Sequence, residues 1–183
     1  MSPLLLLEIE VSSHSLTDSY PIEAAWLQID PDTGEPLDEL ESVLIRPAPG
    51  WTDWSPEHER AHRIRRELIE KRGKPTSVVA LRLLAAARAC DAVVVSSSPW
   101  VEGSLRRLLE AAVLDPYAIR VETVPRALSR VAGLPMPLAA QLVAEITPYL
   151  PRLKHRAGAD LLRSRALWQL CLEARWSIEQ AGL

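Results

Sequence analysis

The sequence is poor in cysteine, and this shortage excludes two kinds of structural framework. Its 183 residues include only two cysteines, Cys90 and Cys171, with no CxxC spacing and no histidine cluster beside them. We therefore expect neither a disulfide framework nor a structural zinc site. A reducing, cytoplasmic compartment is the default expectation.

Long apolar runs and a strong net charge are missing too. The N-terminal apolar run covers only residues 4–7, with no basic segment before it and an acidic pair after it. Neither a signal peptide nor a membrane span is expected, because a span needs about 20 apolar residues. The formal net charge of −3 argues against a general basic surface that coats nucleic acid. Any polyanionic partner must therefore be bound locally.

Apolar residues are plentiful enough for one core. They make up 48% of the chain, which has no internal repeat and no low-complexity segment. A chain of this length is too short to make two domains the better interpretation. We expect a single domain over residues 1–183.

Strand-like and helix-like segments alternate along the chain, which is typical of α/β proteins. Residues 4–10 predict a buried strand, and residues 20–30 and 37–47 predict a hairpin around the turn sequence DPDTGEP. Further strands are expected over 91–98 and 117–124, and helices over 55–73, 76–87, 100–114 and most of the remainder. This is the element order of a ribonuclease H-like α/β domain, with a five-stranded mixed sheet flanked by helices.

Two glutamates end the first strand. Glu8 and Glu10 are two residues apart, so in a strand both side chains lie on one face, about 7 Å apart. That separation suits two carboxylates that flank a pair of divalent ions about 3.5 to 4 Å apart. The alternative is a solvated pair of glutamates at a strand end.

Later elements bring further acids towards the same sheet edge. Glu102 falls in the first turn of the helix after the VVVSSS strand, near the edge where open α/β folds place their sites. Its alternative role is a favourable contact with the helix N-terminus. The segment HRAGAD places His155 and Asp160 at the start of a late helix. Each of these motifs alone is common by chance, whereas all of them in this order and structural context are not.

Together these motifs resemble the DEDD superfamily of 3′→5′ exonucleases, in its histidine-containing subgroup. EIE at residues 8–10 stands where that family has Asp-x-Glu, SSPWVEGSLRRLL resembles its HNxxFDxxFL segment, and HRAGAD matches its His-x₄-Asp motif. YPIEAAW resembles its second strand at Glu23, and AHRIRRELIEKRG resembles its IHGIxxExLxxxG segment at His62 and Ile64. Glu8 and Glu102 replace aspartates, which keeps the charge and adds a methylene to each side chain.

The resemblance implies a metal-dependent enzyme that hydrolyses single-stranded DNA or RNA from the 3′ end to nucleoside 5′-monophosphates. Glu8, Glu10, Glu102 and Asp160 would hold two Mg²⁺ or Mn²⁺ ions. His155 would act as general base towards a water. The segment VSSH, residues 11–14, stands where the family usually has TTGL. The resemblance implies that substrate is bound by this segment and by two residues shortly before Glu102, namely Val11, Ser12, Ser13, His14, Ser98 and Trp100.

Other interpretations stay open. One is an exonuclease-fold module with weakened catalysis that binds nucleic acid or protein, and another is a hydrolase of short oligonucleotides. DNA and RNA are not distinguished, because no motif reports contacts to the 2′-hydroxyl. A homodimer also stays open, because Trp168 and Trp176 on the final helix are expected to be core or oligomer contacts.

Overall fold

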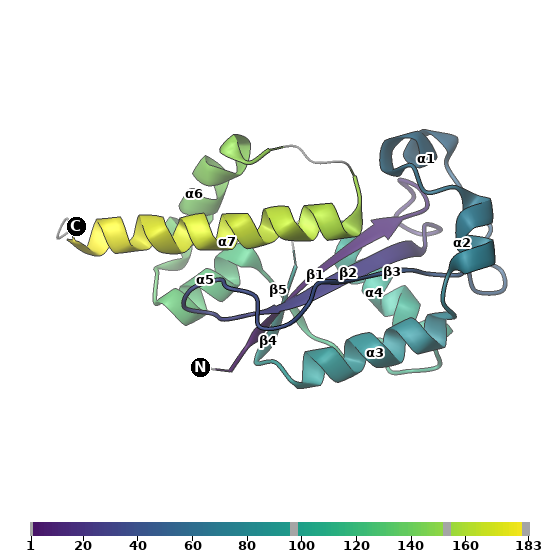
Figure 1. Cartoon of the computed structure of the whole chain (residues 1–183), viewed down its shortest axis with the longest axis horizontal. Helices are drawn as coiled ribbons and strands as arrows, with labels where there is room; N and C mark the ends of the chain where they lie inside the picture. The colour runs from purple at the N-terminus through teal and green to yellow at the C-terminus, as the bar shows by residue number, and fades with distance from the viewer. Residues whose placement is uncertain (1, 96–98, 152–154, 181–183) are drawn as a thin grey trace.

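A five-stranded mixed sheet forms the centre of the computed structural model, which describes residues 2–95, 99–151 and 155–180 (Figure 1). The strand order is β3-β2-β1-β4-β5. β1 (Leu4–Val11) is antiparallel to β2 (Pro21–Ile29) and parallel to β4 (Ala92–Val95). At the edges, β3 (Glu41–Leu44) is antiparallel to β2, and β5 (Val121–Thr123) is parallel to β4. The predicted ribonuclease H-like α/β class is confirmed.

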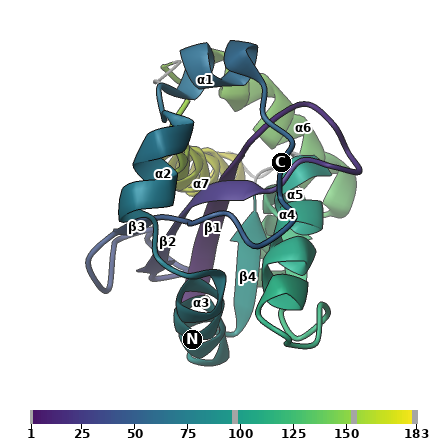
Figure 2. The same ribbon diagram turned by 90° about the vertical axis from the view of Figure 1, so that its right-hand side faces the viewer.

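Helices cover both faces of the sheet. α3 (Thr76–Arg88) and α4 (Pro99–Ala111) pack on one face. α5 (Val124–Ala132), α6 (Met136–Ile146) and α7 (Ala157–Gln180) pack on the other, with the 3₁₀ turn η1 (Thr147–Tyr149) after α6. Figure 1 shows the β1 arrow pointing towards α1 (Pro56–His62) and α2 (Arg66–Arg72), and Figure 2 views the molecule from that end. None of the described helices is long and apolar enough to cross a membrane.

The alternation of side chains along β1 explains how an apolar strand presents carboxylates. Leu4 and Leu6 pack in the core beneath α7, and the odd-numbered positions of the strand pack against α3 and α4. Successive side chains of a strand point to opposite faces, so Glu8 and Glu10 follow Leu4 and Leu6 onto the α7 face. The strand therefore delivers both carboxylates to the helix that carries HRAGAD.

The helix expected over residues 55–73 is wrong in one respect, because the structure has two short helices there. Arg63 has a φ of 57° and its backbone N–H bonds to the carbonyl of Glu59, which ends α1. The break lets Ile64 enter a small core with Tyr20 and Ile22 of the hairpin. Burial of this isoleucine favours the break over a continuous helix.

Two expected strands are shorter than the sequence indicates. The return strand of the hairpin begins only at Glu41, because Asp38 accepts the backbone N–H of Gln28 and ends the regular ladder. β5 covers three residues, after which the chain enters α5 directly. The predicted strand over 91–98 is described as far as Val95, and its three serines lie outside the described residues.

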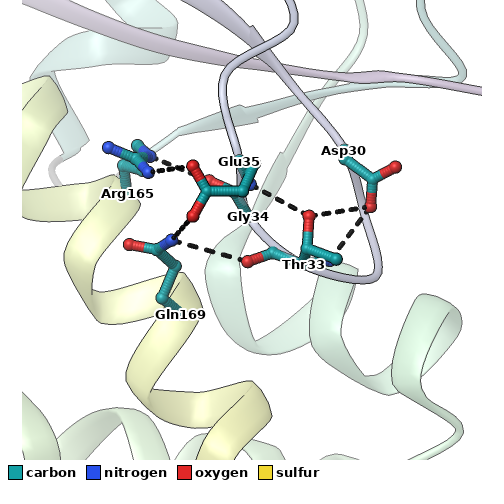
Figure 3. A network of polar contacts seen from close by, with 6 residues as sticks. All are labelled: Asp30, Thr33, Gly34, Glu35, Arg165 and Gln169. Carbon is teal, nitrogen blue, oxygen red and sulfur yellow. Dashed lines mark hydrogen bonds and ion pairs between the residues drawn. The ribbon is translucent and has the colours of Figure 1, made fainter.

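Polar contacts tie the turn between β2 and β3 to the middle of α7 (Figure 3). Arg165 donates from Nε to the carbonyl of Gly34 at 2.8 Å and from Nη2 to Glu35 Oε2 at 3.0 Å. Gln169 donates to Glu35 Oε1 at 3.0 Å. Gly34 has a φ of +70°, and a Cβ there would lie 2.5 Å from Gln169 Cγ, so this approach requires glycine.

Candidate active site

One cavity of about 450 Å³ collects acidic and histidine side chains from separate parts of the chain. β1 and α7 supply carboxylates to one wall, and the loop after β1, α1 and α4 complete the others. All four histidines of the sequence line this cavity. Its polar and aromatic lining residues are Glu8, Glu10, His14, Glu57, His58, His62, Trp100, His155, Asp160, Arg163 and Ser164.

Glu10 and Asp160 form the centre of the acidic wall. Their carboxyl groups lie within hydrogen-bonding reach of each other, and such a bond requires a proton on one of the two. Burial raises the pKa of Glu10 to about 8, together with the hydrogen bond and charge of Asp160 and the charges of Glu23 and Glu8. Burial also raises the pKa of Asp160. The pair therefore keeps a proton that a cation would displace.

Glu8 also contacts α7. Its side chain is buried, and Glu8 Oε1 accepts a hydrogen bond from Ser164 Oγ at 2.7 Å. Ser164 lies one helical turn after Asp160, so the same face of α7 contacts both glutamates of β1. This arrangement fixes the spacing between the carboxylates across the strand–helix interface.

Three imidazoles and one indole form another part of the lining. The rings of His14 and His58 have centroids 3.7 Å apart, and those of His14 and Trp100 are 6.2 Å apart. Burial, followed by the charge of His58, lowers the pKa of His62 to about 4. Burial and the charge of His14 likewise lower the pKa of His58. Both shifts favour the neutral forms of the His58 and His62 imidazoles.

The first turn of α7 is anchored by Glu23 of β2. Glu23 is 1% exposed and forms an ion pair with Arg156, the residue after His155. The carboxylate also accepts the backbone N–H of Ala157 at 3.0 Å and Ser42 Oγ at 3.1 Å. Four donors thus converge on one buried side chain beside the cavity.

Glu102 is not brought to this cavity in the described structure. Its carboxylate pairs with Arg106 one turn along α4, at 2.5 Å, and its side chain is 54% exposed. It lines a separate cavity of about 760 Å³ beside β5 and α5. The spacing placed Glu102 in the correct turn of α4, but its side chain does not join Glu8, Glu10 and Asp160.

The residues expected to bind substrate divide into two groups. Val11, His14 and Trp100 line the cavity. Ser12 and Ser13 are buried and bond to other protein groups. Ser12 Oγ accepts the N–H of Tyr20 at 3.1 Å within the loop, and Ser13 Oγ donates to Asp53, which lies before α1. Neither serine is among the lining residues, so both shape the loop. Ser98 lies outside the described residues.

Several lining residues were not among the predicted site residues, although His62 was named as a match to the IHGIxxExLxxxG segment. His58 and His62 are four residues apart on α1, which puts both on one helix face, and that spacing was the available signal. Ser164 follows Asp160 by four residues on α7 and has the same kind of signal. Nothing local in the sequence indicates that α1 covers the end of β1.

The carboxylate oxygens of this cavity are the type of ligand that a hard divalent cation prefers, because Mg²⁺ and Mn²⁺ bind oxygen ligands. Glu8, Glu10 and Asp160 line the cavity and supply such oxygens. Over residues 2–95, 99–151 and 155–180, no three His, Cys, Asp or Glu side chains are arranged as a group that could hold a metal ion. The observation that supports the fit is the close approach of the Glu10 and Asp160 carboxyl groups. Two carboxylates this close repel each other, and either a shared proton or a bound cation relieves that repulsion.

No family profile and no curated protein matches this sequence. Solved structures do match in fold. Exonuclease I from Methylocaldum szegediense is similar with a TM-score of 0.74 and 17% identity, over 94% of this chain and 41% of its own. E. coli exonuclease I in complex with a dT13 oligonucleotide has a TM-score of 0.71 and 14% identity, over 93% and 41%. A zinc-bound E. coli exonuclease I–ssDNA complex has a TM-score of 0.70 and 15% identity, over 93% and 40%.

This chain thus spans about two fifths of the length of those structures. At this level of identity the similarity concerns the fold alone. The chain has the α/β fold found in exonuclease I.

Proposed function

We propose that this protein is a divalent-metal-dependent 3′→5′ exonuclease that acts on single-stranded DNA or RNA, in one domain over residues 1–183. The observation that carries the proposal is the cavity in which Glu8, Glu10, Asp160 and His155 meet. The fold shared with exonuclease I, solved in complex with oligonucleotides, supports the same activity. All of these residues come from one chain, so the proposal does not require a homodimer.

The carboxylates would bind metal ions, and the histidine would act as the general base. Glu8, Glu10 and Asp160 would hold two Mg²⁺ or Mn²⁺ ions, which would supply an acidified water and charge stabilisation for a leaving 3′ oxygen. His155 is exposed beside these carboxylates and would take the proton of the water on an imidazole nitrogen. The product would be a nucleoside 5′-monophosphate. A cytoplasmic location is part of the proposal, in keeping with two free cysteines.

The aromatic part of the lining suits a nucleobase. His14, His58 and Trp100 line the cavity with aromatic rings, and base–aromatic stacking contributes about 1 to 3 kcal/mol per base. A terminal nucleotide would place its base against these rings and its phosphate towards the carboxylates. The cavity would then have one aromatic side and one metal-binding side.

The position of Glu102 favours a second candidate, a module with the same fold and weakened catalysis. The fourth acid of the resemblance is paired with Arg106 rather than directed into the cavity. A misplacement of about 1 Å in a catalytic group can lower a rate by about 10²-fold. Such a module would bind single-stranded nucleic acid and cut it slowly or not at all.

Incubation of 5′-labelled single-stranded DNA and RNA with Mg²⁺ or Mn²⁺ tests the proposal. We expect stepwise shortening from the 3′ end, abolished by a chelator and lowered at least about 10²-fold in Glu10→Gln and Asp160→Asn. Glu67→Gln, an exposed α2 glutamate outside the lining residues, is the matched control. Binding without cutting would favour the weakened module, and neither binding nor cutting would refute both.

A further inference from the structure

The start of α7 depends on one buried carboxylate of β2. Glu23 accepts hydrogen bonds from Arg156 Nε at 2.9 Å and Arg156 Nη2 at 2.5 Å, in addition to those from Ala157 and Ser42. A two-pronged contact of this kind fixes the guanidinium in direction as well as distance. The first turn of α7 is therefore oriented by the sheet itself.

This anchor lies directly beside the acidic wall. Glu23 and Glu10 are partners across the β1–β2 ladder. Arg156 follows His155, and its carbonyl accepts the N–H of Asp160 at 2.9 Å. The Glu23–Arg156 ion pair thus fixes the turn that connects His155, the proposed base, with Asp160.

Arg156 also interacts electrostatically with a second carboxylate, that of Glu10. The charge of Glu10 is among the causes that raise the pKa of the Arg156 guanidinium, after the bond and charge of Glu23. The Arg156 side chain is 42% exposed, whereas that of Glu23 is 2% exposed, so Arg156 has room to move and Glu23 does not. Without Glu23, Arg156 would be free to turn towards Glu10.

We propose that Glu23 and Arg156 are positioning residues of the cation site. The pair sets the first turn of α7 against β1, so that Asp160 lies beside Glu10, and it holds the positive charge of Arg156 away from the carboxylates. The second part rests on the proposed function, since it concerns cation binding. The first part concerns only the placement of the helix.

Hydrogen–deuterium exchange tests the placement without any activity. In Glu23→Gln we expect the amides of Ala157 and Asp160 to exchange at least about tenfold faster, because the charged bonds to the sheet are lost. The matched control is Glu35→Gln, which removes the ion pair of Arg165 on the same helix but contacts no cavity residue. Unchanged exchange at these two amides in Glu23→Gln would overturn the placement.

Titration with Mn²⁺ alone tests the charge separation. We expect Glu23→Gln to bind Mn²⁺ about tenfold more weakly, and the double variant Glu23→Gln with Arg156→Gln to recover most of that loss because the competing cation is gone. Replacing both partners leaves neither charge without its partner, so we expect the double variant to keep its fold. Equal weakness in both variants would overturn the charge separation. If the unmodified protein binds no Mn²⁺, the proposed function fails, and the exchange result still decides the placement.

Discussion

The hydrogen-bonded pair of Glu10 and Asp160 predicts that divalent cations compete with a proton for the cavity. Burial and the neighbouring carboxyl groups raise the pKa of Glu10 to about 8, so the pair holds a proton at pH 7. A carboxylate must lose its proton before it binds a metal ion. Cation binding should therefore release a proton at neutral pH.

The size of this effect follows from the pKa. Well below a pKa of about 8, each pH unit lowers the apparent affinity about tenfold. Because half of the sites already hold the proton at pH 8, the affinity should fall about 50-fold from pH 8 to pH 6. Because the folded-state pKa is raised, the proton stabilises the metal-free protein at low pH. That stability is complete below the unfolded pKa of 4.5 and is lost as the pH rises through about 8. Mn²⁺ should therefore raise the melting temperature more at pH 8 than at pH 6.

Calorimetric titration with Mn²⁺ between pH 6 and pH 9, in two buffers of different ionisation enthalpy, measures both quantities. We expect release of about one proton per binding event at pH 6 and almost none at pH 9. Glu10→Gln should remove the proton release, and the control Glu67→Gln should keep it. An affinity that is the same at pH 6 and pH 8, with no proton released, would refute the reasoning.

Three further predictions follow from individual contacts. His155→Ala should lower turnover by about 10²- to 10⁴-fold and leave Mn²⁺ affinity intact, and unchanged turnover would remove this histidine from the mechanism. Ser164→Ala should cost about 1 to 3 kcal/mol in urea unfolding, because buried Glu8 loses a donor, whereas Ser177→Ala on the exposed end of α7 should cost less. Although burial acts to raise the pKa of Glu23, its ion pair and hydrogen bonds outweigh burial and lower it. Its contribution to stability should therefore be present above its unfolded pKa and lost as the pH falls through the lower folded value, and Glu23→Gln should abolish this acid dependence.

The sheet and its carboxylates were predictable because they depend on local periodicity. The two-residue repeat of β1 determines that Glu8 and Glu10 share a face with Leu4 and Leu6, whatever packs on that face. The short motif HRAGAD likewise places Asp160 in the first turn of α7. These features need no knowledge of distant contacts.

Features that depend on tertiary contacts were not predictable in the same way. The break at Arg63 exists because Ile64 finds a core beneath the hairpin, which helical spacing alone does not reveal. Glu102 lies in the predicted turn, but its side chain pairs with Arg106, and spacing fixes position rather than direction. Ser12 has the polarity of a ligand but satisfies the backbone of its own loop.

The gathering of every histidine on one cavity has a practical consequence for spectroscopy. The imidazole C2 protons of a protein resonate in a sparsely populated region of the proton NMR spectrum, and here all four such signals come from the lining of this cavity. Because burial and the charge of His58 lower the pKa of His62 to about 4, its signal should keep a constant shift from pH 6 to pH 9. The signals of His14, His58 and His155 can then be followed against that internal standard as cations or nucleotides are added. The unlabelled protein thus carries its own set of reporters, with no signal of this kind arising elsewhere in the chain.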